Sequence, residues 1–94
     1  MKVVLALAVS FGQAVRNRRQ TLGLSQEELA WRCGLNRSYI TDIERGARNP
    51  SLRTIGRLAE ALQMPLYALL REAEEQLPER SRDRATRVKG APPP

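Results

Sequence analysis

The stretch that decides the fold is residues 26–45, which read Gln-Glu-Glu-Leu-Ala-Trp-Arg-Cys-Gly-Leu-Asn-Arg-Ser-Tyr-Ile-Thr-Asp-Ile-Glu-Arg. Ser25 precedes it, and Glu28 follows Ser25 by three residues, which is the spacing of a capping box at the start of a helix. Gly34 predicts the end of that helix, because a residue without a Cβ atom enters the left-handed region at little cost. Asn36 suits the N-cap of a second helix. The stretch therefore predicts two short helices joined by a tight turn.

The apolar residues of this stretch fall at helical spacing in both halves. Leu29, Ala30 and Cys33 share one face of the first helix, and Ile40 and Ile43 share one face of the second. Ala30 is small enough to let the second helix cross closely over the first. A helix, a glycine-containing turn and a second helix at a steep angle form the helix-turn-helix arrangement.

Two runs carry a resemblance to a known family: residues 22–30, which read Leu-Gly-Leu-Ser-Gln-Glu-Glu-Leu-Ala, and residues 37–52. Together they resemble the lambda-repressor/Cro-like (XRE-type) DNA-binding domains of bacteria and phages, and the resemblance extends from about Phe11 to Leu70. Within it, residues 37–52 are most similar to the controller proteins of restriction-modification systems. The resemblance implies an all-α fold, a five-helix lambda-repressor-like DNA-binding domain that contains the helix-turn-helix.

The helices on either side are predicted from their own end signals. Ser10, with Gln13 three residues later, is expected to be the N-cap of the first domain helix, which Gly23 ends. Ser51 is expected to cap a fourth helix, and Pro65 suits the first turn of a fifth. The apolar stripe of the fourth helix is expected to comprise Leu52, Ile55, Leu58, Ala59 and Leu62.

Three segments are expected: an apolar arm at 1–9, the DNA-binding domain at 10–77 and a disordered basic tail at 78–94. The apolar run at 3–9 is far shorter than the about 20 residues that span a bilayer, and no small-residue cleavage pattern follows it. This run is expected to form a strand-like or helical arm, to pack on a partner subunit, or to precede the functional start codon. The tail has Val88 as its one large aliphatic residue, so it buries too little to repay ordering. Its basic residues either touch DNA phosphates or only keep the chain soluble.

Composition points to a polyanionic partner and away from catalysis. The 94 residues carry a net charge of +6, and 14 of the 16 basic residues are Arg, whose guanidinium forks onto guanine edges and phosphates. The chain has no His and one Cys, and it has no glycine-rich phosphate loop. We therefore expect no enzyme activity, no metal and no cofactor. The single Cys excludes an intrachain disulfide and suits a reducing cytoplasm.

Two groupings are expected to hold the fold and its assembly together. In the family, an Arg of the first helix pairs with a Glu at the end of the recognition helix, and the resemblance places this pair at Arg19 and Glu44. The alternative is two exposed charges of little consequence. The fifth helix has apolar residues that either all serve the core or in part form a homodimer seam. The expected seam residues are Leu66, Tyr67, Leu69, Leu70 and Ala73.

In helix-turn-helix docking, the second helix lies in the major groove and its N-terminal residues face the base edges. The predicted base-reading residues are Arg37, Ser38, Thr41 and Asp42. Arg37 suits guanine O6 and N7 together, and Asp42 suits cytosine N4. Alternatively, Asp42 braces Arg37 or Arg45 within the helix.

Contacts to the DNA backbone are expected from the start of the first motif helix, the recognition-helix cap and the loop beyond. In the family the residue at Gln26 bonds a phosphate, helped by free amides and the helix dipole. Tyr39 either packs on the sugar-phosphate wall or a thymine methyl, or only shields the loop. The expected backbone set is Gln26, Asn36, Tyr39, Arg48, Asn49 and Ser51.

The leading interpretation is a cytoplasmic, sequence-specific transcriptional regulator that binds double-stranded DNA at a pseudo-palindromic operator as a homodimer. No membrane and no small-molecule substrate are expected. Two alternatives remain: an antitoxin that also caps a toxin, and a protein-interaction module that kept the fold without DNA binding. The polar, Arg-bearing recognition helix argues against the second.

Overall fold

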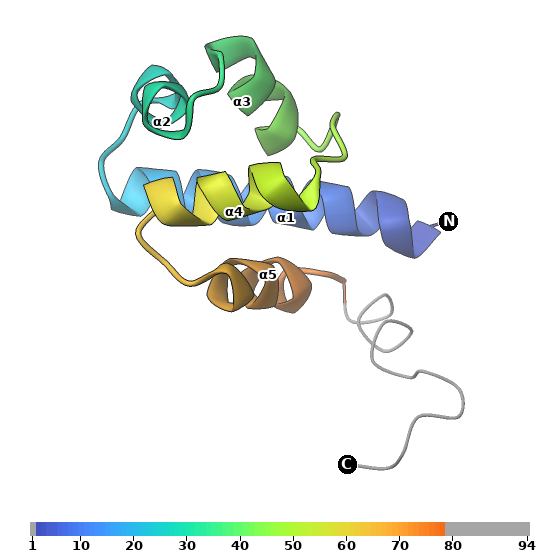
Figure 1. Ribbon diagram of the computed structural model, residues 1–94. Coiled ribbons are helices and arrows are strands. Elements are labelled where there is room, and N and C mark those ends of the chain that lie inside the picture. The colour runs from blue at the N-terminus through green and yellow to red at the C-terminus, as the bar shows by residue number, and fades with distance from the viewer. Residues whose placement is uncertain (1, 79–94) are drawn as a thin grey trace.

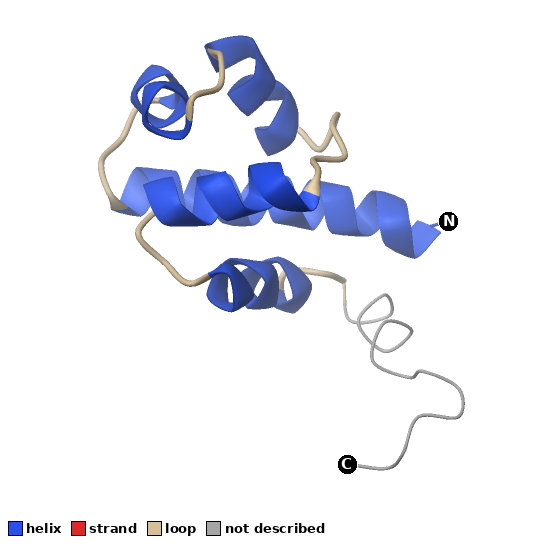
Figure 2. Cartoon of the chain, viewed as in Figure 1, coloured by secondary structure: helices blue, strands red, loops and turns tan. Residues whose placement is uncertain are grey.

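The computed structural model describes residues 2–78, which form five helices (Figure 1). The helices are α1 (Lys2–Thr21), α2 (Gln26–Cys33), α3 (Arg37–Glu44), α4 (Leu52–Ala61) and α5 (Leu66–Glu75). The described residues contain no strand, so the expected all-α fold is confirmed (Figure 2). No helix among them is long and apolar enough to cross a membrane. Met1 and the predicted tail from residue 79 onward lie outside the described residues.

α1 runs through the middle of the molecule, with α2 and α3 on one side of it and α5 on the other (Figure 1). One hydrophobic core joins the helices, and its largest fully buried side chains come from all five of them. They are Val15, Leu29, Ile40, Ile43, Leu58, Leu62 and Leu69. Because α2 and α3 have eight residues each, they are too short to be stable alone and depend on this core.

Three of the four predicted N-caps are present. The Ser25 hydroxyl accepts from the Glu28 amide at 3.0 Å and the Glu28 carboxylate accepts from the Ser25 amide at 2.9 Å, which completes the capping box. The side-chain oxygens of Asn36 and Ser51 accept the corresponding amides of α3 and α4. Gly34 closes α2 in the left-handed region at φ +70°. The ends of the helix-turn-helix are thus fixed by local chemistry, as the sequence predicts.

The predicted start of the first helix is wrong. α1 begins at Lys2, so Ser10 lies within the helix; it is buried, and its hydroxyl donates to the Leu7 carbonyl at 3.2 Å. Gln13 contacts Asn17 at 3.3 Å and caps nothing. No Gly or Pro interrupts the chain between Lys2 and Ser10, so nothing stops the helix from extending backward. Of the expected forms of the N-terminal arm, the helical one is observed.

Leu52 also departs from expectation. It is the first residue of α4 and is 69% exposed, because this end of the helix reaches beyond the edge of the core. The buried residues of α4 are Leu58, Ala59 and Ala61, and Leu62 is buried directly after the helix.

Gly12 allows α1 and α3 to approach each other backbone to backbone. A Cβ atom at Gly12 would fall on the carbonyl oxygen of Ile43 and lie 2.8 Å from that of Glu44. The last turn of α3 therefore rests directly on α1, and no side chain fits between them.

We expect Gly12→Ala to destabilise the domain although Ala is the better helix former. The overlap is with backbone, so the helices must separate, at a cost of about 1–3 kcal/mol or more in the free energy of unfolding. Gly56→Ala in α4 is the matched control, because its Cβ would meet nothing within 4 Å. That change should stabilise the domain by up to about 1 kcal/mol. Urea unfolding measures both variants, and equal signs for the two changes would contradict the close approach.

Candidate nucleic-acid interface

A buried ion pair ties the second helix of the helix-turn-helix to α1. Arg19 Nε donates to Glu44 Oε2 at 2.6 Å, and Arg19 Nη2 donates to Glu44 Oε1 at 3.1 Å. Arg19 Nη1 donates to the Leu24 carbonyl at 2.8 Å. The two charged side chains are 11% and 4% exposed, respectively. This is the pair that the resemblance implies, and its two-pronged geometry and burial exclude two independent surface charges.

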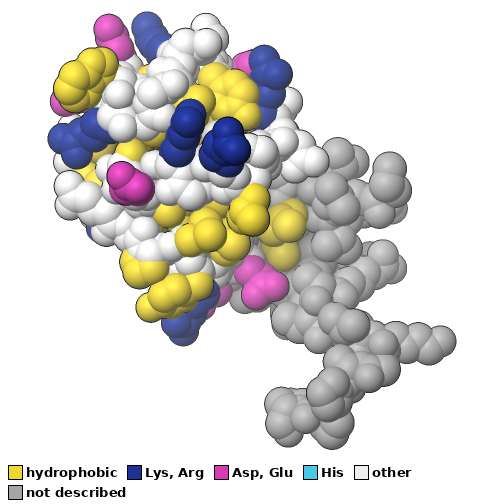
Figure 3. Space-filling model, in the orientation of Figure 1, with side chains coloured by type: hydrophobic (Ala, Val, Ile, Leu, Met, Phe, Trp, Pro, Cys, Tyr) yellow, Lys and Arg dark blue, Asp and Glu magenta, His cyan; other side chains and the backbone are white. Residues whose placement is uncertain are grey.

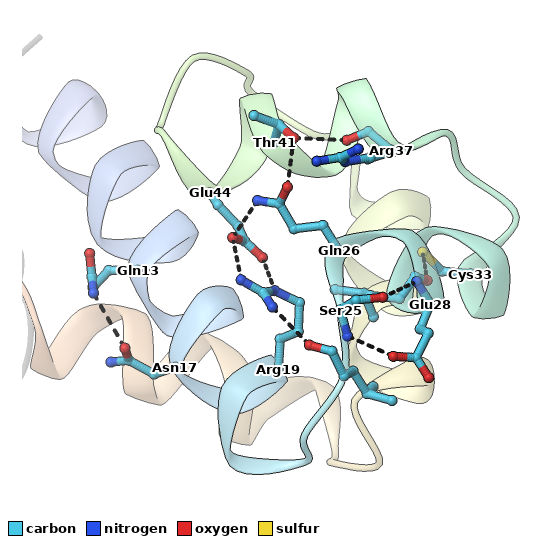
Figure 4. Close-up of polar contacts among 12 residues, drawn as sticks. Gln13, Asn17, Arg19, Ser25, Gln26, Glu28, Cys33, Arg37, Thr41 and Glu44 are labelled. Carbon is cyan, nitrogen blue, oxygen red and sulfur yellow. Dashed lines mark hydrogen bonds and ion pairs between the residues drawn. The ribbon is translucent and has the colours of Figure 1, made fainter.

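The pair continues into a line of hydrogen bonds that reaches the outer side of α3 (Figure 4). Gln26, the first residue of α2, donates from Nε2 to Glu44 Oε1 at 3.0 Å. The Thr41 hydroxyl lies 3.0 Å from Gln26 Oε1 and 3.1 Å from the Arg37 carbonyl, and its single hydrogen serves one of them at a time. The start of α2 and two turns of α3 are thereby held in one register.

The four residues predicted to read bases lie along one side of α3. Arg37 and Ser38 in its first turn are exposed, and Thr41 and Asp42 one turn later are half-buried. Together with Arg45 they line a shallow, open depression. Figure 3 shows Lys and Arg side chains gathered mainly over the half of the molecule in which Figure 1 places α2, α3 and α4. The structure thus brings the predicted base-reading residues together along one side of α3.

Asp42 is engaged within the protein. Its Oδ1 accepts from Arg45 Nη2 at 3.0 Å, and its Oδ2 accepts from Arg48 Nε at 3.3 Å. The Arg48 guanidinium also lies 5.3 Å from the centre of the Tyr39 ring, a cation–π arrangement. The predicted brace is therefore formed with Arg45 and not with Arg37, and the loop after α3 brings Arg48 into it.

Some of the predicted DNA-backbone residues already have partners within the protein, and others are exposed. Asn36 and Ser51 use their side-chain oxygens as helix caps, and Gln26 is held by Glu44 and Thr41. Arg48 and Asn49 are exposed in the loop after α3, and Ser51 is exposed at its end. The structure places all six residues of the set around α3, at the start of α2 or on that loop.

The predicted dimer seam needs correction. Leu69 and Ala73 are fully buried in the monomer, so they have no surface left for a partner. They lie four residues apart on the face of α5 that closes the core, and Leu66 packs partly against that core as well. Tyr67 and Leu70 are 71% and 40% exposed, and these two remain available to a second copy.

Sequence reasoning missed the role of Arg18. Its Nε donates to the Leu62 carbonyl at 2.9 Å and its Nη2 donates to the Gln63 carbonyl at 3.2 Å, at the C-terminal end of α4. These bonds satisfy carbonyls that the helix leaves free, beside a residue with the unusual φ of +57° at Gln63. Only the partner, 44 residues away in the chain, reveals the role, and no local signal marks it.

Two further residues of α2 differ in their exposure. Cys33 is a buried, free thiol in the core, and burial raises its pKa, which keeps it protonated near neutral pH. Trp31 lies on the outer face of α2 and is 84% exposed. The described residues contain no cluster of His, Cys, Asp and Glu that fits a metal ion.

The fold and the geometry of α2 and α3 agree with comparisons to known proteins. The family described as Helix-turn-helix matches residues 15–69, which is more than half of the chain, and the chain belongs to this family.

Among its relatives is the control protein C.BamHI of Bacillus amyloliquefaciens, 53% identical over 53 residues that cover 55% of this chain and 65% of that protein. The restriction-modification controller protein C.AhdI from Aeromonas hydrophila has a similar structure, with 50% identity and a TM-score of 0.65 over 66% of this chain and 94% of the other. The hypothetical transcription factor NHTF from Neisseria gives a TM-score of 0.67 at 34% identity, covering 90% and 89% of the two chains. The chain spans less than two thirds of the length of the first curated relatives it matches.

We expect Arg19→Met and Glu44→Gln each to destabilise the fold by about 3–5 kcal/mol, because either change leaves a buried group without its partner. The double variant should lose much less than the sum of the single losses, since the two residues act as one unit. Chemical denaturation of the four proteins measures this coupling. Additive losses would show that the ion pair contributes nothing of its own.

Proposed function

We propose that this chain is a sequence-specific DNA-binding transcriptional regulator that binds a pseudo-palindromic operator as a homodimer. The observation that carries the proposal is the first turn of α3, whose exposed Arg37 and Ser38 stand on a helix fixed from behind by the Arg19–Glu44 pair. A rigid helix with free polar side chains at its N-terminus suits insertion into the major groove. The regulator would act in the cytoplasm, where bacterial DNA lies.

Arg37 is the residue we assign to a guanine, since no salt bridge within the described residues engages its guanidinium and the fork matches O6 and N7. Ser38 and Thr41 are short and sit beside it, so they would make the permissive contacts. Asp42 has two arginine partners in the free protein. It would read cytosine N4 only after giving up one of them.

The backbone contacts we propose surround this helix. Gln26 retains one amide hydrogen beyond its bond to Glu44, and it stands at the positive end of α2. The phosphates on either side of the groove would be contacted by Asn36, Tyr39, Arg48, Asn49 and Ser51. Such contacts set the register of α3 in the groove without reading sequence.

Arg37→Ala should weaken binding to a preferred genomic fragment by about 1–3 kcal/mol and relax the preference at one base pair per half-site. The fold should be unchanged, because the side chain is exposed. Arg71→Ala is the matched control, because it removes the same charge from an exposed side chain of α5 that pairs with Glu75. Gel shifts over a range of salt, with specific and random DNA, measure both. Equal weakening on the two DNAs would make Arg37 a phosphate contact.

A homodimer follows from the small reading surface, since one recognition helix meets only a few base pairs and discriminates poorly against a genome. Several exposed apolar side chains are available to a second copy. They are Leu7, Leu52, Tyr67 and Leu70, which are 43%, 69%, 71% and 40% exposed. Leu7 and Leu70 line one apolar hollow together with Phe11 and Ile55. We place the seam there in preference to the buried face of α5.

Leu70→Glu should give a folded monomer. The side chain is partly exposed, so a carboxylate there remains solvated in the monomer but would be buried without a partner in the dimer interface. Gln76→Glu, also exposed at the end of α5, adds the same charge outside this surface and should remain dimeric. Sedimentation at micromolar concentration distinguishes the two. A monomeric wild-type protein, or a dimer that survives Leu70→Glu, would contradict this seam.

A further inference from the structure

The first half of α1 contacts the loop that follows the recognition helix. Residues 2–14 lie outside the part of the chain that the helix-turn-helix family matches, residues 15–69. They are nevertheless continuous with α1, which runs unbroken from Lys2 to Thr21. The loop between α3 and α4 turns beside this half of α1 (Figure 1). The turns of α1 before residue 15 thus lie next to the loop that follows the candidate recognition helix.

The contact is closest between Val9 and Gly46. A Cβ atom at Gly46 would lie 2.8 Å from both Cα and Cγ2 of Val9 and 3.2 Å from its amide nitrogen. Gly46 also has φ +76°, in the left-handed region that glycine enters most easily. The bare Cα of Gly46 is therefore required twice, once by the turn itself and once by the approach of α1.

The same half of α1 also lies beneath the end of the loop. Leu7, Ala8 and Phe11 line an apolar hollow of about 100 Å³ whose other walls include Asn49 and Pro50. α1 thus contacts Gly46 through Val9 at the start of the loop, and it shares an apolar hollow with Asn49 and Pro50 at the end of the loop.

On its opposite side, the loop is held by α3. The Ala47 amide donates to the Asp42 carbonyl at 2.8 Å. Arg48 bonds the Asp42 carboxylate at 3.3 Å and lies over the Tyr39 ring. The loop is therefore held on two sides, by α1 and by α3, while Ala47, Arg48 and Asn49 remain exposed.

We propose that the first half of α1 is a positioning element for DNA binding, in which Val9, set against Gly46, fixes the loop so that Arg48 and Asn49 meet the DNA backbone. This inference rests on the proposed DNA-binding function. A loop ordered before binding loses less conformational freedom on the DNA, so its contacts contribute more to affinity. Val9 and Gly46 touch no DNA themselves and act through the loop.

Gly46→Ala tests the contact, with Gly23→Ala as the matched control. Gly23 has φ +71° and a Cβ there would meet nothing within 4 Å, so the control carries the same backbone strain without the collision. Gly46→Ala should lower the thermal midpoint more than the control does. It should also reduce the slope of log K against log salt by about one to two, as expected for lost phosphate contacts. An equal midpoint loss with an unchanged slope in both variants would overturn the proposal.

Val9→Ala keeps the inference testable if Gly46→Ala does not fold, since Ala favours the helix and the change removes the Cγ2 atom that faces Gly46. Amide hydrogen exchange in the DNA-free protein should become severalfold faster at Ala47, while Gln13→Ala, an exposed change on the same helix, should leave it unchanged. Exchange at Ala47 equal to that of the wild type in Val9→Ala would overturn the positioning role. Wild-type protein that binds DNA without salt dependence would instead refute the proposed function, and the exchange result would stand apart from it.

Discussion

The fold depends first on the ion pair between Arg19 and Glu44. α2 and α3 are each eight residues long and cannot persist as isolated helices, so their mutual angle must come from contacts with the rest of the domain. Apolar packing alone tolerates small rotations, whereas a two-pronged charged contact has one good geometry. Because Glu44 is the last residue of α3 and also accepts from Gln26 of α2, one carboxylate sets both motif helices against α1. The face proposed to read DNA is therefore positioned from within the domain.

A second constraint is the close approach of backbones along α1. Gly12 lets the end of α3 rest on α1, and Gly46 lets the following loop rest on it a few residues earlier. The ion pair, Gly12 and Gly46 together hold the last turn of α3 and its loop along one line of contact. The opposite end of α3, with Arg37 and Ser38, is left exposed. A buried, rigid end and a free polar end are what groove insertion requires.

The sequence predicts features whose causes are local. Ser25, Asn36 and Gly34 mark helix ends through bonds within a few residues, and the structure has all three. The predicted start of α1 is wrong because Ser10 has the residue type and spacing of an N-cap, whereas the fold buries it in mid-helix. That burial depends on residues that are distant in the chain.

The remaining differences concern partners that are distant in the chain. Leu69 and Leu70 are equivalent in the sequence pattern, and only the packing of α5 shows that Leu69 serves the core. The sequence allows Asp42 either to contact cytosine or to pair with an arginine of α3. In the structure it pairs with Arg45, and the loop also brings Arg48 to it. Arg19 and Glu44 were paired through the family resemblance, since 25 residues separate them and spacing alone says nothing of their contact. Gly12 carries no local sign of the carbonyl oxygens that it faces.

The central claim is that α3, held from behind by the buried pair, reads DNA sequence in two symmetric copies. Selection of bound DNA from a random duplex pool tests it most directly. We expect enrichment of a pseudo-palindrome whose half-site centres lie about one helical turn, ~34 Å, apart, with a guanine in each half-site whose enrichment depends on Arg37. A pool that retains DNA without any enriched sequence, or an enriched site that lacks two-fold symmetry, would contradict it.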